Sequence, residues 1–353
     1  MHLRKCTFMK RTELEELGEF GLIDRIENAA KPKLDSTIKG IGDDAAVIQA
    51  GDKVKLVSSD MLMEGVHFDL SYSPLKHLGY KAAIVNFSDI YAMNGNVEQI
   101  TVNLGLSNRF SLEAVDELYA GILLACENYG VDLIGGDTVS SNSGLVISIT
   151  VIGTTAANKV SYRSGAKDKE IIVVTGDLGA AYMGLQVLER EKAVFESNPN
   201  IQPDLEGNDY ILERQLKPEA RKDVIELLDQ LGVVPTSMID ISDGLASELL
   251  HICKASGLGC SIYGEKIPID PTVMTAAEDF HLDATTCALN GGEDYELLFT
   301  IKQSDFDKVK GNPNFTFIGH MNDDGSPMLV TRDGSAIELT AQGWDAFRHD
   351  RSE

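Results

Sequence analysis

The sequence predicts an α/β protein of two domains, the first over residues 1–155 and the second over residues 156–353. Short runs rich in β-branched residues alternate with longer segments of helical period, as in domains that pack helices on a sheet. A chain of 353 residues suits one large or two medium domains. Two such series of elements meet near residues 154–165, so we place the junction there.

Three helices and three strands are expected in the first half. The helices cover residues 12–30, 74–93 and 111–130, and the strands cover residues 53–59, 99–106 and 145–153. Thr12 and Glu15 have the spacing of a capping box at the start of the first helix. Pro74 suits the first position of the second helix, and Ser111 is a favoured N-cap for the third.

The second half carries more strands. They are expected over residues 170–175, 237–241, 295–301, 315–319 and 328–331, and helices over residues 178–189, 218–232 and 242–256. Pro218 marks the start of the second of these helices, and Gly232 its end. Residues 191–208 are polar and contain two prolines and a glycine, so we interpret them as a loop or insertion.

Composition excludes several classes of function. With 31 basic and 55 acidic residues, the net charge is −24, which disfavours binding to duplex nucleic acid or to an anionic membrane. No apolar run approaches the roughly 20 residues of a membrane span. The five cysteines are scattered without a C-x-x-C pair, which favours a reducing compartment over a disulfide framework or a zinc site. We therefore expect a cytoplasmic protein.

Five short segments place carboxylates beside glycines or at the ends of predicted strands. They are Gly40–Ala46, Ser58–Asp60, Gly135–Thr138, Asp240–Gly244 and Gly291–Asp294, of which the last two are expected to join a strand to a helix. Mg²⁺ prefers oxygen ligands and shares them with substrate phosphates, and a neighbouring glycine lets the backbone approach a phosphate. Singly, each segment also fits a turn or an N-cap. Together they favour a site for metal and phosphate.

One further carboxylate is predicted within a helix. Asn86 and Asp89 are three residues apart and so share a helix face, where both have poor helix propensity. An inward-facing Asp89 would be costly unless it were paired or bound to metal, whereas an exposed one would need no partner. The phosphate-binding loop G-x-x-x-x-G-K-[ST] is absent, as is the protein-kinase set of motifs.

The ordered motifs resemble those of thiamine-monophosphate kinases over residues 18–347. They are Gly40–Ala45, Leu133–Thr138, Arg163–Ala166, Ile239–Leu245 and Gly291–Leu297. That family is similar to aminoimidazole-ribonucleotide synthetase, selenophosphate synthetase and the hydrogenase maturation factor HypE. The resemblance implies two α/β domains of the aminoimidazole-ribonucleotide synthetase-like fold, with the N-terminal sheet pairing across a homodimer.

The resemblance also implies a reaction: ATP- and Mg²⁺-dependent phosphorylation of thiamine monophosphate to thiamine diphosphate, with release of ADP, by direct in-line transfer. The positions that match ligands of several Mg²⁺ ions are Asp44, Ser58, Ser59, Asp60, Asp89, Asp137, Asp240 and Asp243. The positions that match ATP contacts are Tyr119, Gly136, Asp137, Arg163 and Ser242. The positions that match substrate contacts are His67, Glu293 and Trp344.

Asp44, Asp240 and Asp243 are the residues expected to carry catalysis. Donor and acceptor are both anionic, so metal ions would neutralise their charge and align them. The acceptor phosphate is already ionised near neutral pH, so no strong general base and no covalent nucleophile is expected. Positioning and electrostatic stabilisation would supply most of the rate.

Other interpretations remain for single residues. His67 also fits an ordinary loop histidine, and Trp344 a packing residue of the tail, although an aromatic plane would suit a cationic ring. Arg163 also fits a surface charge and Tyr119 a core position.

Other functions are disfavoured by what the chain lacks. Selenophosphate synthetase would need a reactive Cys and Lys in a glycine-rich segment, but Cys6 lies far from any glycine run. HypE would need a C-terminal cysteine, where this sequence has Arg351-Ser352-Glu353. A purely structural Mg²⁺ or Ca²⁺ module has no EF-hand spacing to support it.

Overall fold

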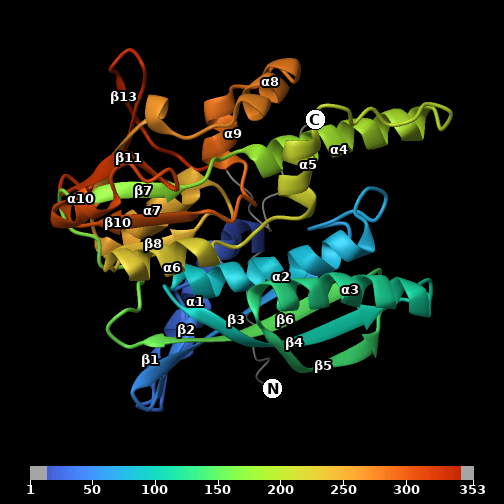
Figure 1. The fold of residues 1–353 in the computed structure, drawn as a ribbon, viewed down its shortest axis with the longest axis horizontal. Helices are drawn as coiled ribbons and strands as arrows, with labels where there is room; N and C mark the ends of the chain where they lie inside the picture. The colour runs from blue at the N-terminus through green and yellow to red at the C-terminus, as the bar shows by residue number, and fades with distance from the viewer. Residues whose placement is uncertain (1–13, 343–353) are drawn as a thin grey trace, which may run out of the picture.

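The computed structural model describes residues 14–342 and confirms a mixed α/β fold with two sheets (Figure 1). The first sheet has the strand order β1-β2-β3-β6-β4-β5. Its strands are β1 (Thr37–Lys39), β2 (Ala46–Ala50), β3 (Lys53–Met63), β4 (Asn96–Leu106), β5 (Asp132–Ser140) and β6 (Val146–Ala156). All neighbours are antiparallel except β4 and β5, so β5 forms a parallel edge strand.

Helix α2 (Leu75–Ala92) lies on this first sheet and also touches the second, so it sits between them (Figure 1). Helix α3 (Leu112–Tyr129) packs on α2. The two helix backbones nearly touch, because a Cβ added at Gly79 would lie 2.0 Å from the carbonyl oxygen of Leu118. A Cβ at Gly121 would lie 1.9 Å from the carbonyl oxygen of Lys76. Only glycine permits this approach.

The second sheet has the order β13-β12-β9-β11-β7-β10-β8. Its strands are β7 (Ile171–Thr175), β8 (Ser237–Asp240), β9 (Gly259–Tyr263), β10 (Leu297–Ile301), β11 (Phe315–Asn322), β12 (Pro327–Val330) and β13 (Ala336–Glu338). Only the β9–β12 pair is parallel among these strands. Strand β10 is buried along its whole length, as expected for an apolar strand inside a sheet.

The remaining elements surround the second sheet or precede the first. The helices are α1 (Gly18–Ala29), α4 (Ala180–Ser197), α5 (Asp209–Leu216), α6 (Lys222–Leu231), α7 (Leu245–Ser256), α8 (Pro271–Asp279), α9 (Ala284–Asn290) and α10 (Phe306–Val309). Three short 3₁₀ turns are η1 (Leu14–Glu16), η2 (Gly264–Lys266) and η3 (Gln303–Asp305). One apolar cluster joins both halves, since it contains Phe87 of α2 together with Met238 and Phe299 of the second sheet.

Several predicted boundaries are wrong. Residues 191–208 are not a loop throughout, because α4 continues to Ser197. Pro218 does not start a helix, since α5 ends before it and α6 begins at Lys222. The first helix begins at Gly18 without a side-chain cap, and Thr12 lies outside the described residues. The short strands β1, β2 and β9 and the helices α5, α8 and α9 were not predicted.

The predicted caps of α3 are confirmed. Helix α3 starts at the N-cap Ser111, whose Oγ accepts a hydrogen bond from the Ala114 N–H at 3.3 Å, and ends at left-handed Gly130. The four described cysteines are buried and free of disulfides. No helix of the described chain is long and apolar enough to cross a membrane.

Candidate active site

A cleft of about 720 Å³ runs between α2 and the second half of the chain. Its walls come from segments far apart in the sequence: the loop before β2, strand β3, the turn between β8 and α7, and the loop between α9 and β10. Helix α2 is buried from Leu78 to Met93 except at Asp89, which is half-buried. Between Leu78 and Met93, Asp89 is therefore the one residue that is not fully buried, and it lines the cleft.

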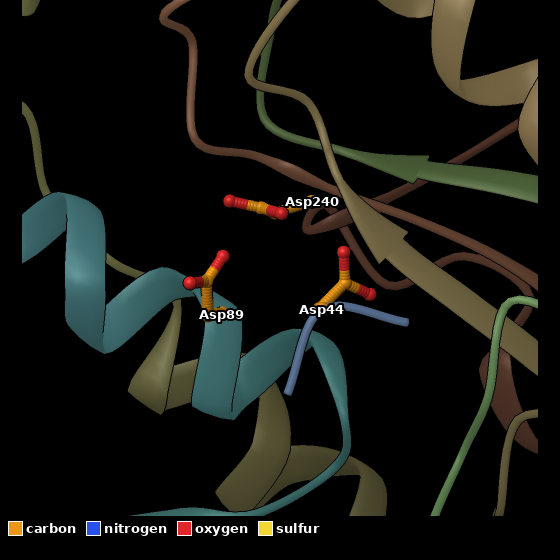
Figure 2. Close-up of side chains that lie close together, drawn as sticks. All are labelled: Asp44, Asp89 and Asp240. Atoms are coloured by element: carbon orange, nitrogen blue, oxygen red, sulfur yellow. The ribbon is translucent and has the colours of Figure 1, made fainter. Parts of the chain in front are cut away.

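Three carboxylates converge in the cleft, and Figure 2 shows them pointing toward one another. Asp44 precedes β2, Asp89 lies on α2, and Asp240 ends β8. One oxygen atom from each lies within 4.8 Å of those of the other two. The helical Asp89 therefore joins the glycine-flanked aspartates, as its poor helix propensity suggested.

Burial and mutual repulsion raise the pKa values of these carboxyl groups. Burial, followed by the charge of Asp44, raises the pKa of Asp240 to about 7. Burial and the charge of Asp60 raise the pKa of Asp89 well above its usual value. A cation beside such groups would favour their charged forms.

Arg163 supplies one such cation. Its Nε and Nη2 donate to the same Asp44 oxygen, Oδ1, at 3.1 and 2.5 Å, and its backbone N–H donates to Asp43 at 2.9 Å. The other oxygen of Asp44, Oδ2, is buried without a hydrogen-bond partner. An unpartnered carboxylate oxygen beside two further carboxylates fits a divalent cation with oxygen ligands.

Hydroxyl groups orient two of the three carboxylates. Ser58 Oγ of β3 donates to Asp89 Oδ2 at 2.6 Å, and Ser88 Oγ of α2 donates to Asp240 Oδ2 at 2.5 Å. Ser88 is fully buried and was not predicted. A serine inside a buried helix was its only sequence signal. Both bonds stabilise the charged form of their acceptors.

Strand β3 presents only part of the segment Ser58–Asp60 to the cleft. Alternation along the strand turns Ser58 and Asp60 toward it, and burial raises the pKa of Asp60 to about 6. The side chain of Ser59 points to the other face, where its Oγ contacts the Ile149 carbonyl at 3.2 Å. The expectation that this segment ends a strand is wrong, because β3 continues to Met63.

The turn between β8 and α7 adds Ser242 and Asp243 to the cleft. Its backbone is fixed by Glu248, whose Oε1 accepts from the N–H groups of Ser242 and Asp243 at 3.1 and 2.8 Å. Burial raises the pKa of Asp243 to about 6 and that of Glu248 to about 8. Glu248 was missed, although a Glu in the first turn of a predicted helix is a typical capping partner.

Two of the three predicted substrate contacts, His67 and Glu293, line the cleft. His67 lines the cleft, and its Nδ1 accepts from the Met63 N–H at 3.1 Å. Glu293 also lines the cleft and pairs with Lys81 and Gln215, which sequence reasoning missed. Its loop follows helix α9 and precedes strand β10, so the predicted strand-to-helix order is reversed there. Trp344 lies outside the described residues.

Three residues predicted to contact ATP do not line this cleft. They are Tyr119, Gly136 and Asp137. Tyr119 lies on α3 and packs against the core. Gly136 and Asp137 lie inside the edge strand β5, not at its end as predicted. Asp137 is exposed, and its Oδ1 accepts from the Thr138 N–H at 2.8 Å. A Cβ at Gly136 would lie 1.8 Å from the Val102 carbonyl oxygen, so close strand pairing requires glycine.

The chain is similar to known proteins over most of its length. Residues 42–155 match the model of the AIR synthase related protein, N-terminal domain. The chain is 33% identical to thiamine-monophosphate kinase of Aquifex aeolicus, covering 95% of this chain and 99% of that protein. It is 34% identical to thiamine-monophosphate kinase of Bacillus subtilis, covering 88% and 93%. The solved structure of AaThiL complexed with AMPPCP and TMP matches with a TM-score of 0.83 and 30% identity, covering 96% of this chain and 100% of that one.

Proposed function

Because this chain belongs to the thiamine-monophosphate kinase family, we propose that it transfers the γ-phosphate of ATP to thiamine monophosphate, forming thiamine diphosphate and ADP. The observation that carries this proposal is the likeness to AaThiL, which was solved with AMPPCP, an ATP analogue, and TMP. The match covers 96% of this chain, so it includes both sheets and the cleft between them. A kinase that phosphorylates a phosphate monoester must bring the phosphates of ATP and of the acceptor together. The carboxylates of the cleft could bind the metal ions that neutralise both phosphates.

We propose that Asp44, Asp89 and Asp240 hold Mg²⁺, with Ser58, Asp60 and Asp243 as further oxygen ligands nearby. The close approach of the first three and the unpartnered Asp44 Oδ2 support this assignment. Bound Mg²⁺ would neutralise the oxygens of the donor and acceptor phosphates. Ser59 and Asp137 are weaker members of the proposed set, because their side chains do not line the cleft of their own chain.

The protein groups would then position the reactants. Arg163 offers a guanidinium group beside Asp44, where it can donate to phosphate oxygens as well as to that carboxylate. The acceptor is an ionised phosphate oxygen, so the cleft needs no base to remove a proton from it. Rate enhancement would come from alignment of the reactants and from charge stabilisation in the cleft.

We also propose that the N-terminal sheets of two copies pair in a homodimer. The edge strand β5 supports this, since its residues are exposed or half-exposed along its whole length. Ile134 and Val139 on this strand each leave 57% of their surface exposed. An exposed edge with apolar side chains is a template for pairing with another chain. The same strand carries Gly136 and Asp137, so pairing would bring these residues to the partner.

The domain boundary remains a proposal at residues 155/156. It is supported by the end of β6 at Ala156 and the start of the second sheet at Ile171.

The decisive experiment measures ADP and thiamine diphosphate formed from ATP, Mg²⁺ and thiamine monophosphate. Parallel reactions contain free thiamine or other phosphate monoesters as acceptors. We expect turnover with thiamine monophosphate that stops when EDTA removes the metal and returns when Mg²⁺ is restored. Turnover of another monoester, without turnover of thiamine monophosphate, would contradict the proposed substrate.

A further inference from the structure

An ion pair between buried Lys81 and half-buried Glu293 lies in the cleft and takes no part in the cluster of Asp44, Asp89 and Asp240. Lys81 Nζ lies 3.0 Å from Glu293 Oε1 and donates to the Gln215 carbonyl oxygen at 2.9 Å. Gln215 Nε2 donates to the second oxygen of Glu293, Oε2, at 3.0 Å. Lys81 is 5% exposed, and all three residues line the cleft. Both oxygens of Glu293 are therefore held by donors of the protein.

Lys81 and the carboxylate cluster occupy opposite ends of one helix face. Lys81, Val85 and Asp89 follow at intervals of four residues on α2 and all line the cleft. Residues at this interval lie one above another on a helix. At 1.5 Å per residue, Lys81 and Asp89 are about 12 Å apart along the helix axis. This face forms the floor of the cleft, with Asp89 at one end, Lys81 at the other and apolar Val85 between.

The backbone of Glu293 is also held in a fixed conformation. Its backbone φ is 58°, a left-handed conformation that is uncommon for a residue with a side chain. The conformation is fixed by a hydrogen bond from the Glu293 N–H to the Ser242 carbonyl at 2.7 Å. Asp294 next to it accepts from the Gly179 N–H at 2.8 Å at the start of α4. A carboxylate with so little freedom is suited to recognise a ligand group of defined position.

We propose that Lys81 is a positioning residue for the substrate, because it orients Glu293 at the end of the floor away from Asp89. One oxygen of Glu293 is in an ion pair with Lys81, and the other accepts a hydrogen bond from Gln215. Each oxygen retains capacity to accept another hydrogen bond, so a hydrogen-bond donor of the ligand fits there. The exocyclic amine of the aminopyrimidine ring is the donor that thiamine monophosphate carries. The substrate would lie along α2 with its phosphate near Asp89 and this amine at Glu293.

This inference rests on the proposed function, so its test starts from the wild-type reaction. The variant is Lys81→Met, which keeps the apolar stem and removes the ammonium group. The matched control is Lys159→Met, which breaks the ion pair of Lys159 with Asp229 outside the cleft. The probes are thiamine monophosphate and its 4-oxo analogue, oxythiamine monophosphate, which lacks the amine.

We expect Lys81→Met to raise the KM for thiamine monophosphate by about tenfold, the size of one lost interaction with a charged group. The KM for ATP and the kcat should change by less than about threefold, and Lys159→Met should change none of these values. The wild type should prefer thiamine monophosphate over its 4-oxo analogue, and Lys81→Met should lose most of that preference. Lys81→Gln keeps a hydrogen-bond donor without the charge, so it should raise the KM for thiamine monophosphate by less. It replaces Lys81→Met in the test if that variant does not fold.

A double variant separates positioning from an independent effect. If Lys81 acts through Glu293, Lys81→Met should add little to the KM rise caused by Glu293→Gln. Rises that multiply in the double variant, or an unchanged KM in both Lys81 variants, would overturn the inference while leaving the kinase activity in place. Absence of wild-type turnover of thiamine monophosphate would instead refute the proposed function.

Discussion

Ser88 Oγ, on the helix that packs on the first sheet, donates a hydrogen bond to Asp240 Oδ2, at the end of a strand of the second sheet, at 2.5 Å. The two residues are 152 positions apart, and both are buried. The bond connects the two halves of the chain at the carboxylate cluster itself. It also lowers the pKa of Asp240, against the larger effect of burial that raises it.

Ser88→Ala should weaken metal binding without unfolding the protein. Without the hydroxyl, the pKa of Asp240 rises further, so less of the carboxylate is ionised at neutral pH. We expect the Mg²⁺ concentration at half-maximal rate to rise by about tenfold, the effect of losing a hydrogen bond to a charged acceptor. Ser197→Ala, which removes an exposed hydroxyl bonded to the Val194 carbonyl, is the control. Equal Mg²⁺ dependence in both variants would show that the Ser88 hydroxyl does not affect the metal site.

Asp240→Asn should abolish most of the activity and yet stabilise the metal-free protein. The amide cannot supply a charged ligand, so kcat/KM should fall at least a hundredfold. In EDTA the same change removes one negative charge from a buried cluster of carboxylates, so the melting temperature should rise. Differential scanning fluorimetry and the ADP assay measure the two effects. An unchanged rate at limiting Mg²⁺ would remove Asp240 from the metal site.

Stability without metal should depend on pH with a definite sign. The pKa is raised to about 7 for Asp240 and to about 6 for Asp60 and Asp243, from an ordinary value of 3.8. Between pH 4 and pH 7 the folded state therefore binds more protons than the unfolded chain, and stability from these groups is lost as the pH rises. In EDTA, we expect their contribution to be complete below pH 4 and absent above about pH 7.

Bound Mg²⁺ should counteract that loss, since it stabilises the ionised carboxylates. The difference in melting temperature between Mg²⁺ and EDTA should therefore grow from pH 6 to pH 8. Asp229 is exposed and forms an ion pair with Lys159, so Asp229→Asn should leave this increase with pH unchanged. Asp240→Asn should make the increase smaller. A difference that stays constant over this range would contradict the assignment of these carboxylates to the metal.

The proposed dimer can be tested at the edge strand. Ile134→Lys places a charge among exposed apolar residues of β5, which disfavours pairing with a second chain. Light scattering after size-exclusion chromatography should give a dimer for the wild type and a smaller mass for the variant. Leu112→Lys, at a highly exposed position where α3 begins, is the matched control. A wild-type protein that is monomeric at micromolar concentration would refute the pairing.

Much of this architecture could be predicted because local signals were strong. The apolar run Ile171–Thr175 and the caps Ser111 and Gly130 determine elements by themselves. The three-residue strand β1 has too few residues for a period, so it was missed. Segments with proline were also misjudged, since Pro218 lies between two helices where a helix start was expected.

The sequence could predict which residues belong to the site but not which of them contact one another. Asp44, Asp89 and Asp240 were identified by residue type and spacing, and the structure brings them together. No local pattern could show that Lys81 meets Glu293, because that contact depends on how two sheets pack. The orientation of Ser59 was also beyond reach, since a shift of one residue in the predicted strand exchanges the two faces.

The near contact of α2 and α3 at Gly79 and Gly121 also affects hydrogen exchange. Amides of a helix covered by a sheet on one side and by a closely packed helix on another open to solvent chiefly when the whole domain unfolds. The backbone amides of α2 around Asp89 should therefore be among the last in the protein to exchange with deuterium. The element that supplies the floor of the cleft would then keep its shape through every local opening, and heat should destroy activity only as the fold itself is lost.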